Sequence, residues 1–331
     1  MSKEPLTRTV EATAQQIIAD TPDPVVHLRL LRDVLDFHGQ ELHEARAALD
    51  QSQWVQVLAR EQRADGGWGR FHTNDYSAEQ AISKTEAGVE RSLDVGLDKD
   101  HPILRNAANY ICRILRGKEV FPDRAERNDR WRIGWVLFAA STLARIDATH
   151  PLLDEPWRRW SEVLQRSFPQ GQFSDAALME AHRYVNGLRD EVGYLDLRTR
   201  YASFLIGSRA DQLPGWLSDA YARWLWSHPH GLGYIDVPLS SLPRHGRYMP
   251  GWLRSMNVLA HYPSWRKLAG GVVSALLQQR NTDGFWDYGP AARELRFSEC
   301  WRRNPRSHDH SLAVLTLLRQ YNRTTQTGPE T

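Results

Sequence analysis

This 331-residue sequence has few cysteines, little net charge and no long apolar run, and each of these shortages excludes a class of protein. Its two cysteines, Cys112 and Cys300, lie far apart, which excludes a disulfide framework and suits a reducing cytoplasm. The net charge is only +2, and no zinc-finger spacing or basic tail occurs, so nothing indicates nucleic acid binding. No run approaches the roughly 18 apolar residues of a membrane-spanning helix, and the first residues lack the apolar core of a secretory signal. We therefore expect a cytoplasmic protein, as monomer or homodimer.

The apolar residues that are present follow helical spacing. From Pro102 to Leu115 they recur on one face, and Gly117 follows the end of this predicted helix. The next segment, 131–146, is apolar on nearly all sides, which is typical of an interior helix. A similar pattern begins again near residues 151 and 263, so the sequence predicts an array of helical hairpins. The best candidate strand, 231–237, is short.

The domain organisation follows from the same pattern. No linker interrupts the helical segments, so we expect one all-α domain over residues 23–322. Residues 1–22 are expected to be an N-terminal extension, and residues 323–331 a disordered tail.

Two segments share a more specific motif. Residues 62–69 read QRADGGWG and residues 279–286 read QRNTDGFW, and each follows a predicted helix. Asp-Gly favours a tight turn, and the glycine can adopt positive φ. The tryptophan can then fold back on the helix end, while the Gln amide binds backbone groups. The motif therefore indicates a structural device that joins neighbouring helices.

These motifs resemble the Gln–Trp repeats of squalene and oxidosqualene cyclases and the Gly-rich turns of protein prenyltransferase β-subunits. Residues 83–102 are also similar to the inner-helix pattern of short stand-alone bacterial members of that superfamily. The resemblance implies a single α/α toroid of ten to twelve helices, in inner and outer rings around a cavity. The Asp-x-Asp-Asp motif of class II cyclases and the Asp-Asp-x-x-Asp motif of class I terpene synthases are absent. The resemblance therefore concerns the fold more than the reaction.

Candidate acid/base and anion-binding residues stand before the predicted inner helices. Lys84 and Glu86 precede one such helix, with Glu90 one turn after Glu86, and two close carboxylates can divide acid and base roles. Asp129 and Arg132 begin the apolar helix, where Asp129 is either an acid/base group or the N-cap.

A third candidate group lies in the segment 175–183. Glu180 is a possible acid/base residue, and His182 is a possible substrate ligand. Two residues that are two positions apart do not share a helical face, so they are not expected to act as a pair.

The fourth candidate group, residues 299–310, has the most varied chemistry. Cys300, His308 and His310 have the donor types that zinc prefers, and the resemblance to prenyltransferases makes zinc possible here. The Asp-x-Cys pairing of those enzymes is missing, however, so no cofactor is expected. The alternative is that Asp309 or Ser307 caps the last helix and that His310 lines the cavity and transfers protons.

Tryptophan is abundant, with 13 residues, and aromatic rings can line an apolar or cation-stabilising pocket. The aromatic residues that we expect to contact a substrate are Trp135, Trp252, Tyr288 and Trp301. We expect an enzyme that cyclises, isomerises or eliminates a small, largely apolar natural-product-type substrate by acid/base chemistry. Two alternatives stay open: a non-catalytic toroid that binds a small molecule or a protein, and a carbohydrate-active α/α-barrel enzyme.

Overall fold

Helices make up the regular structure of this protein. The computed structural model describes residues 3–20, 22–74, 77, 81–233 and 236–323. In these ranges there is no strand, and Lys84 makes only isolated bridges with Gly69 and Arg70. The all-α class is confirmed, whereas the strand expected at 231–237 is wrong for those of its residues that are described. The toroid arrangement stays a prediction, and the expected tail falls outside the described residues except for Arg323.

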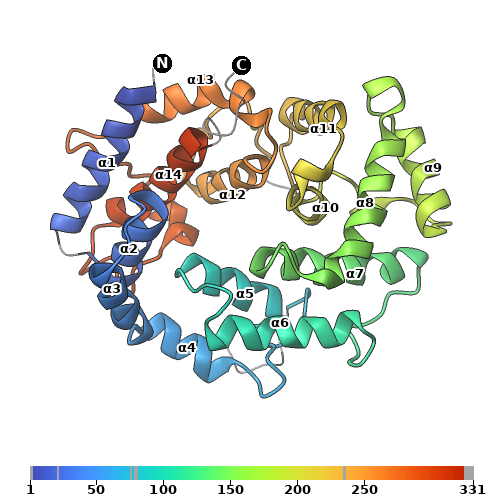
Figure 1. The fold of residues 1–331 in the computed structure, drawn as a ribbon, viewed down its shortest axis with the longest axis horizontal. Helices are drawn as coiled ribbons and strands as arrows, with labels where there is room; N and C mark the ends of the chain where they lie inside the picture. Colours follow the sequence, from blue (N-terminus) through green and yellow to red (C-terminus); the bar gives the residue numbers. More distant parts are fainter. Residues whose placement is uncertain (1–2, 21, 75–76, 78–80, 234–235, 324–331) are drawn as a thin grey trace. The chain divides into compact units, whose positions relative to one another are not determined.

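By its internal contacts the chain divides into two compact units, and the single domain expected over residues 23–322 stays a prediction. The first unit comprises Met1–Gln56, Trp226–Gly231 and Ile235–Thr331, and the second comprises Val57–Leu225 and Leu232–Tyr234. The helices of the first unit are α1 (Lys3–Ala19), α2 (Pro24–Arg29), α3 (Gln40–Asp50), α12 (Met249–Leu259), α13 (Trp265–Gln278) and α14 (Arg306–Arg323) (Figure 1). Those of the second unit are α5 (Thr85–Asp94), α6 (Pro102–Leu115), α7 (Asp129–Ile146), α8 (Asp154–Ser167), α9 (Asp175–Asn186) and α10 (Arg200–Gly207). The unit boundaries fall within α4 (Gln53–Glu61) and α11 (Gly215–Ser227).

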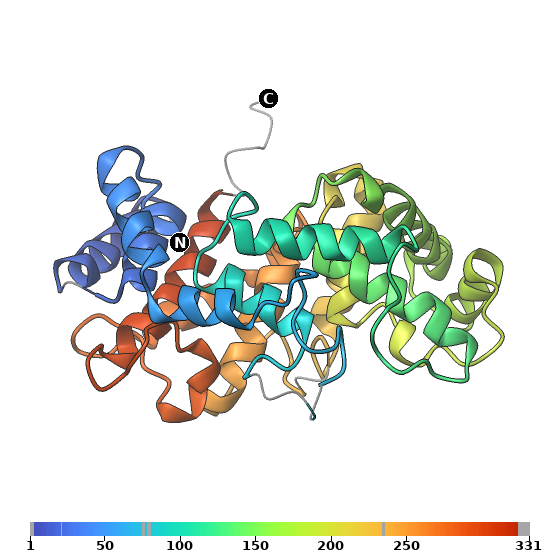
Figure 2. The ribbon, with the colours of Figure 1, turned by 90° about the horizontal axis from the view of Figure 1, so that it is seen from below.

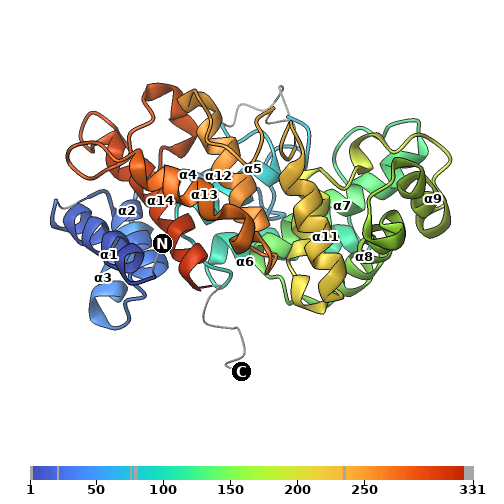
Figure 3. The same cartoon turned by 90° about the horizontal axis from the view of Figure 1, so that it is seen from above.

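In the first unit, the segment expected to be an N-terminal extension forms α1. Its buried residues follow helical spacing, and the helix packs on α14, as Figure 3 shows. These residues are Leu6, Val10, Ala14 and Ile17. None of the described helices combines the length and the apolar character that a bilayer span requires.

In the second unit, α7 is the central helix. It packs against α5, α6, α8 and α10, and Figures 1 and 2 show α5 and α6 beside it. The interior position expected for this all-apolar segment is confirmed, because its burial extends around the helix from Ile133 to Ile146. The amphipathic helix expected from Pro102 is confirmed as α6, which buries one face.

Both Gln–Trp motifs form the expected turns. Trp68 folds back on α4 and donates its indole N–H to the Leu58 carbonyl, at 3.1 Å. Trp286 repeats this contact on α13 with the Leu276 carbonyl, at 2.7 Å. Both indoles are fully buried, so each motif joins a helix end to the core of its unit.

Candidate functional site

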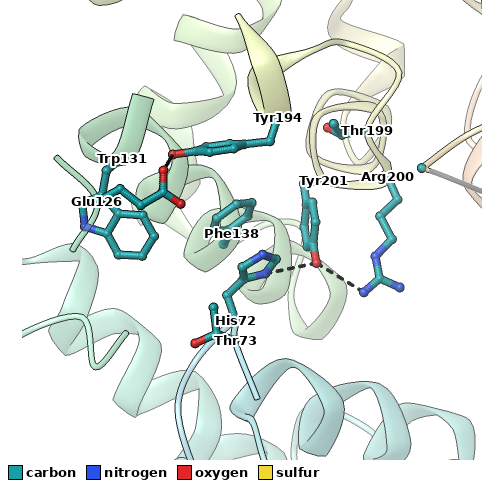
Figure 4. Close-up of a pocket in the computed structure, with 10 residues that line it drawn as sticks. His72, Thr73, Glu126, Trp131, Phe138, Tyr194, Thr199, Arg200 and Tyr201 are labelled. Atoms are coloured by element: carbon teal, nitrogen blue, oxygen red, sulfur yellow. Dashed lines mark hydrogen bonds between the residues drawn. The ribbon is translucent and has the colours of Figure 1, made fainter. Parts of the chain in front are cut away.

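A pocket of about 400 Å³ lies within the second unit. Aromatic rings provide much of its wall, and polar groups stand at several points around it (Figure 4). The residues that line it are His72, Thr73, Glu126, Trp131, Phe138, Tyr194, Thr199, Arg200, Tyr201 and Gly233.

The first Gln–Trp turn leads directly to the pocket. After Trp68 the chain is held by the buried Asp123 carboxylate, which accepts hydrogen bonds from three successive backbone N–H groups. The distances are 2.7 Å from Phe71, 3.1 Å from His72 and 2.6 Å from Thr73. Because three donors share one carboxylate, the backbone that carries His72 is closely restrained.

The partly buried His72 side chain contacts the buried carboxylate of Glu86. Its Nδ1 lies 3.0 and 3.1 Å from the two carboxylate oxygens, and Glu86 is only 4% exposed. Glu86 belongs to the first turn of α5, where the helix dipole favours a negative charge. The imidazole is stacked on Phe138, with ring centroids 3.9 Å apart. Stacking on Phe138 therefore fixes the plane of the imidazole, and the contact with Glu86 fixes its Nδ1 edge.

Tyr201 completes this group from α10. Its hydroxyl donates to Glu86 at 2.9 Å and lies 3.3 Å from Nδ1 of His72. Burial, followed by the negative charge of Glu86, raises the pKa of Tyr201, so the phenol stays protonated and remains a donor.

Arg200 lies next to Tyr201 and donates to its hydroxyl at 3.3 Å. It also pairs with Glu90 at 3.7 Å, and Arg145 approaches Glu90 from α7 at 3.6 Å. Burial alone would lower the pKa of Arg200, but Tyr201, Glu90 and Glu86 outweigh this effect and raise it. The arginine therefore keeps its charge inside a network of acidic and phenolic partners.

This arrangement leaves one ring nitrogen of His72 for a ligand. Because Nδ1 contacts the carboxylate, it is the nitrogen that donates, and Nε2 is left as the basic nitrogen. No residue within the described ranges hydrogen-bonds Nε2, and His72 lines the pocket. A histidine oriented in this way by a carboxylate can accept and return a proton.

Of the candidates predicted from the sequence in the second unit, Glu86 belongs to this site and Glu90 joins it through Arg200. Lys84 is half-buried at the residue before α5 and does not line the pocket. Asp129 and Arg132 also lie outside the lining. Arg132 is exposed and donates to the Asn186 carbonyl at 2.7 Å.

The remaining expectations on α7 concern its N-cap and the packing of Trp135. The N-cap is Asn128, whose side chain accepts from the Trp131 N–H, so the alternative that Asp129 caps this helix is wrong. Trp135 packs against Phe121, at a centroid distance of 5.8 Å.

On α9 neither of the two candidates lines the pocket. Glu180 points to solvent and pairs with Arg183, because the buried face of this helix is formed by its neighbours, including His182. His182 is fully buried, and its ring nitrogens contact the Leu195 carbonyl and the Asn186 amide. Burial lowers its pKa to about 4, so it is a neutral histidine of the core.

The candidates at 299–310 belong to the first unit, and none of them lines the pocket. Asp309 is neither free nor an N-cap, because α14 begins at Arg306 and the buried carboxylate accepts from Ser298 and from the Trp301 indole, at 2.5 Å. Burial raises its pKa to about 6. Its role resembles that of Asp123, since both hold a loop by its backbone.

The histidines of α14 are also buried. His310 accepts from the Tyr288 N–H at 3.0 Å, and burial lowers its pKa to about 4. His308 lies 3.4 Å from Asp20. Trp252 is fully buried in the core of this unit, so its expected contact with a substrate is replaced by packing. Throughout the described residues, no three His, Cys, Asp or Glu side chains, Cys300 included, are grouped as metal ligands.

Sequence reasoning missed most of the pocket. His72, Tyr201, Arg200 and Glu126 were not singled out, since they come from three segments that lie far apart in the sequence and meet only through folding. One signal was present: His72 follows Trp68 by four residues, where the Gly-rich turn must lead toward the next helix.

Comparison with protein-family models, with curated proteins and with solved structures finds no match to this chain.

Proposed function

We propose that this protein is an enzyme that moves protons to or from a small, largely apolar molecule bound in the pocket of the second unit. The observation that carries the proposal is the His72–Glu86 contact, which leaves Nε2 of a pocket histidine without a partner among the described residues. Isomerisation, elimination and cyclisation all need such a proton transfer.

In this proposal each residue of the site has a separate role in proton transfer. His72 exchanges the proton at Nε2, and Glu86 is a positioning residue that holds Nδ1 and stabilises the imidazolium formed during the reaction. Tyr201 holds Glu86 in place through its hydroxyl. A substrate bound against the aromatic walls would displace water from the site, which would strengthen these electrostatic interactions. A general acid/base of this kind contributes roughly 10² to 10⁴ in rate.

The cyclase-type toroid remains part of the proposal. Two Gln–Trp turns with matching indole contacts support it, together with the all-helical fold. A histidine–carboxylate pair would then do the work that cyclases assign to an aspartate-rich motif, which this sequence lacks.

The experiment measures proton transfer to or from unknown substrates and compares two histidine variants. The protein is incubated with a metabolite extract in D₂O, and mass spectrometry identifies compounds that are consumed or gain deuterium. His72→Asn should lower that rate about 100-fold or more, because the proton acceptor is lost. The control, His43→Asn, changes an exposed histidine of α3 and should leave the rate unchanged.

Two results would count against the proposal. Equal rates for His72→Asn and the unaltered protein would remove His72 from the chemistry. A compound that is retained but neither consumed nor labelled would favour a binding protein that uses the same pocket.

A further inference from the structure

One carboxylate of the pocket has unused bonding capacity. Glu126 accepts through Oε2 from the Tyr194 hydroxyl at 3.1 Å and from the Asn128 amide at 2.7 Å. Its Oε1 has no hydrogen-bond partner among the residues that the structure describes, and none of their basic side chains pairs with it. The carboxylate is thus held in position while one oxygen is left for a ligand.

The Trp131 ring, on the same side of the pocket (Figure 4), contacts Phe121 in a T-shaped arrangement at a centroid distance of 5.6 Å. The other aromatic rings of the pocket already have partners. Arg130 lies over Tyr194 at 5.8 Å, and Arg200 lies over Tyr201 at 5.2 Å. Phe138 stacks against the imidazole of His72. Within the described part of the chain, Trp131 has no cation over its ring. Tryptophan is the aromatic side chain that attracts cations most strongly.

Asn128 holds Glu126 and Trp131 together. Its amide nitrogen donates to the Glu126 carboxylate, and its oxygen accepts from the Trp131 backbone N–H at 2.9 Å. Figure 4 shows both side chains on one side of the pocket, with Tyr194 hydrogen-bonded to Glu126 and His72 farther along the wall.

Arg200, the arginine that lines the pocket, is less available to an anionic ligand than Glu126 is to a cationic one. Arg200 is paired with Glu90 and hydrogen-bonded to Tyr201, and Glu86 lies close enough to raise its pKa. An anionic ligand would have to compete with these groups. A cationic ligand would meet no competing basic side chain at Glu126 or Trp131 among the residues that the structure describes.

We propose that the substrate carries an organic ammonium group, which binds between the Trp131 ring and Oε1 of Glu126. This inference rests on the proposed function, because it takes the same pocket as the active site. The ammonium group donates to the carboxylate and lies against the indole, while the apolar remainder of the molecule extends along Phe138 toward His72.

The test compares three probes of similar shape by calorimetric titration at low ionic strength: 2-phenylethylammonium, the neutral 2-phenylethanol and the anionic 3-phenylpropionate. We expect the ammonium to bind about tenfold or more tightly than either of the others, as one charged hydrogen bond and one cation–π contact would produce. Glu126→Gln should reduce this preference to about threefold or less, because the amide keeps the shape without the charge. Trp131→Phe should weaken binding less than Trp131→Leu does, since a ring is retained.

The control is Glu180→Gln, which removes an exposed carboxylate of the same unit and should leave every affinity unchanged. No binding of the ammonium, equal affinity for the three probes, or a preference that survives Glu126→Gln would overturn the inference. His72→Asn separates the two proposals: it should abolish turnover and leave ammonium binding intact. Loss of the cation site with His72-dependent turnover retained would refute this inference alone.

Discussion

At the scale of single residues, buried ionisable groups in this protein have two different roles. Asp123 and Asp309 bind backbone N–H groups and hold loops, and His182 uses both ring nitrogens within the core. His72 uses one ring nitrogen and leaves the other facing a pocket. What separates a structural histidine from a candidate for chemistry is therefore its unused hydrogen-bonding capacity rather than its burial.

The pH dependence of stability should reveal His182. Its pKa is about 4 in the folded protein and near 6.5 when unfolded, so below pH 6.5 the unfolded state binds more protons. Stability contributed by this group is present at pH 7 and is lost as the pH falls toward 4. The loss is on the order of 2–3 kcal/mol, from a shift of about two units. In His182→Gln the drop in unfolding midpoint between pH 7 and pH 4.5 should shrink, as measured by chemical denaturation. A drop as large as that of the unaltered protein would contradict this.

At the scale of elements, the two Gln–Trp turns are alike in the indole contact and differ in their surroundings. Both glycines adopt positive φ, +95° at Gly66 and +86° at Gly284. A Cβ at Gly66 would lie 2.3 Å from the Asn106 carbonyl oxygen, whereas one at Gly284 would meet nothing within 4 Å. The first turn is therefore packed tightly against α6.

This difference provides a matched pair of variants. Gly284→Ala should cost about 1 kcal/mol, the price of positive φ for a residue with a Cβ. Gly66→Ala should cost more, about 2 kcal/mol or above, because backbone must also move. Urea denaturation followed by circular dichroism measures both, and equal losses would show that the close approach to Asn106 is easily relieved.

At the scale of the whole molecule, each unit has its own buried core. Leu137 of α7 and Leu315 of α14 are both completely buried, one in each unit. The packing of α7 involves α5, α6, α8 and α10, while that of α14 involves α1, α2 and α12.

Truncating one leucine in each unit should thus act locally. Leu137→Ala and Leu315→Ala should each cost about 2–5 kcal/mol. Hydrogen exchange should show the loss of protection mainly in α5–α8 and α10 for the first variant and in α1, α2, α12 and α14 for the second. If either variant reduced protection equally throughout both units, the two cores would unfold as one.

The features that depend on local spacing could be predicted from the order of the residues alone. Apolar periodicity placed α6 and the interior helix α7, and the Asp-Gly-containing motifs predicted turns in which Trp68 and Trp286 fold back. These predictions succeeded because helix periodicity and turn geometry are set by residues only a few positions apart.

Which polar residues meet depends on how distant segments pack together, and this could not be predicted from the sequence. Glu86 was singled out for its position before a helix, but its partners His72 and Tyr201 are 14 and 115 positions away. Glu180 and His182 were equally reasonable on paper, and packing turned one to solvent and enclosed the other. A side chain's surroundings arise from contacts between distant segments, and these contacts, rather than residue type or local spacing, decide whether it holds the fold or faces a ligand.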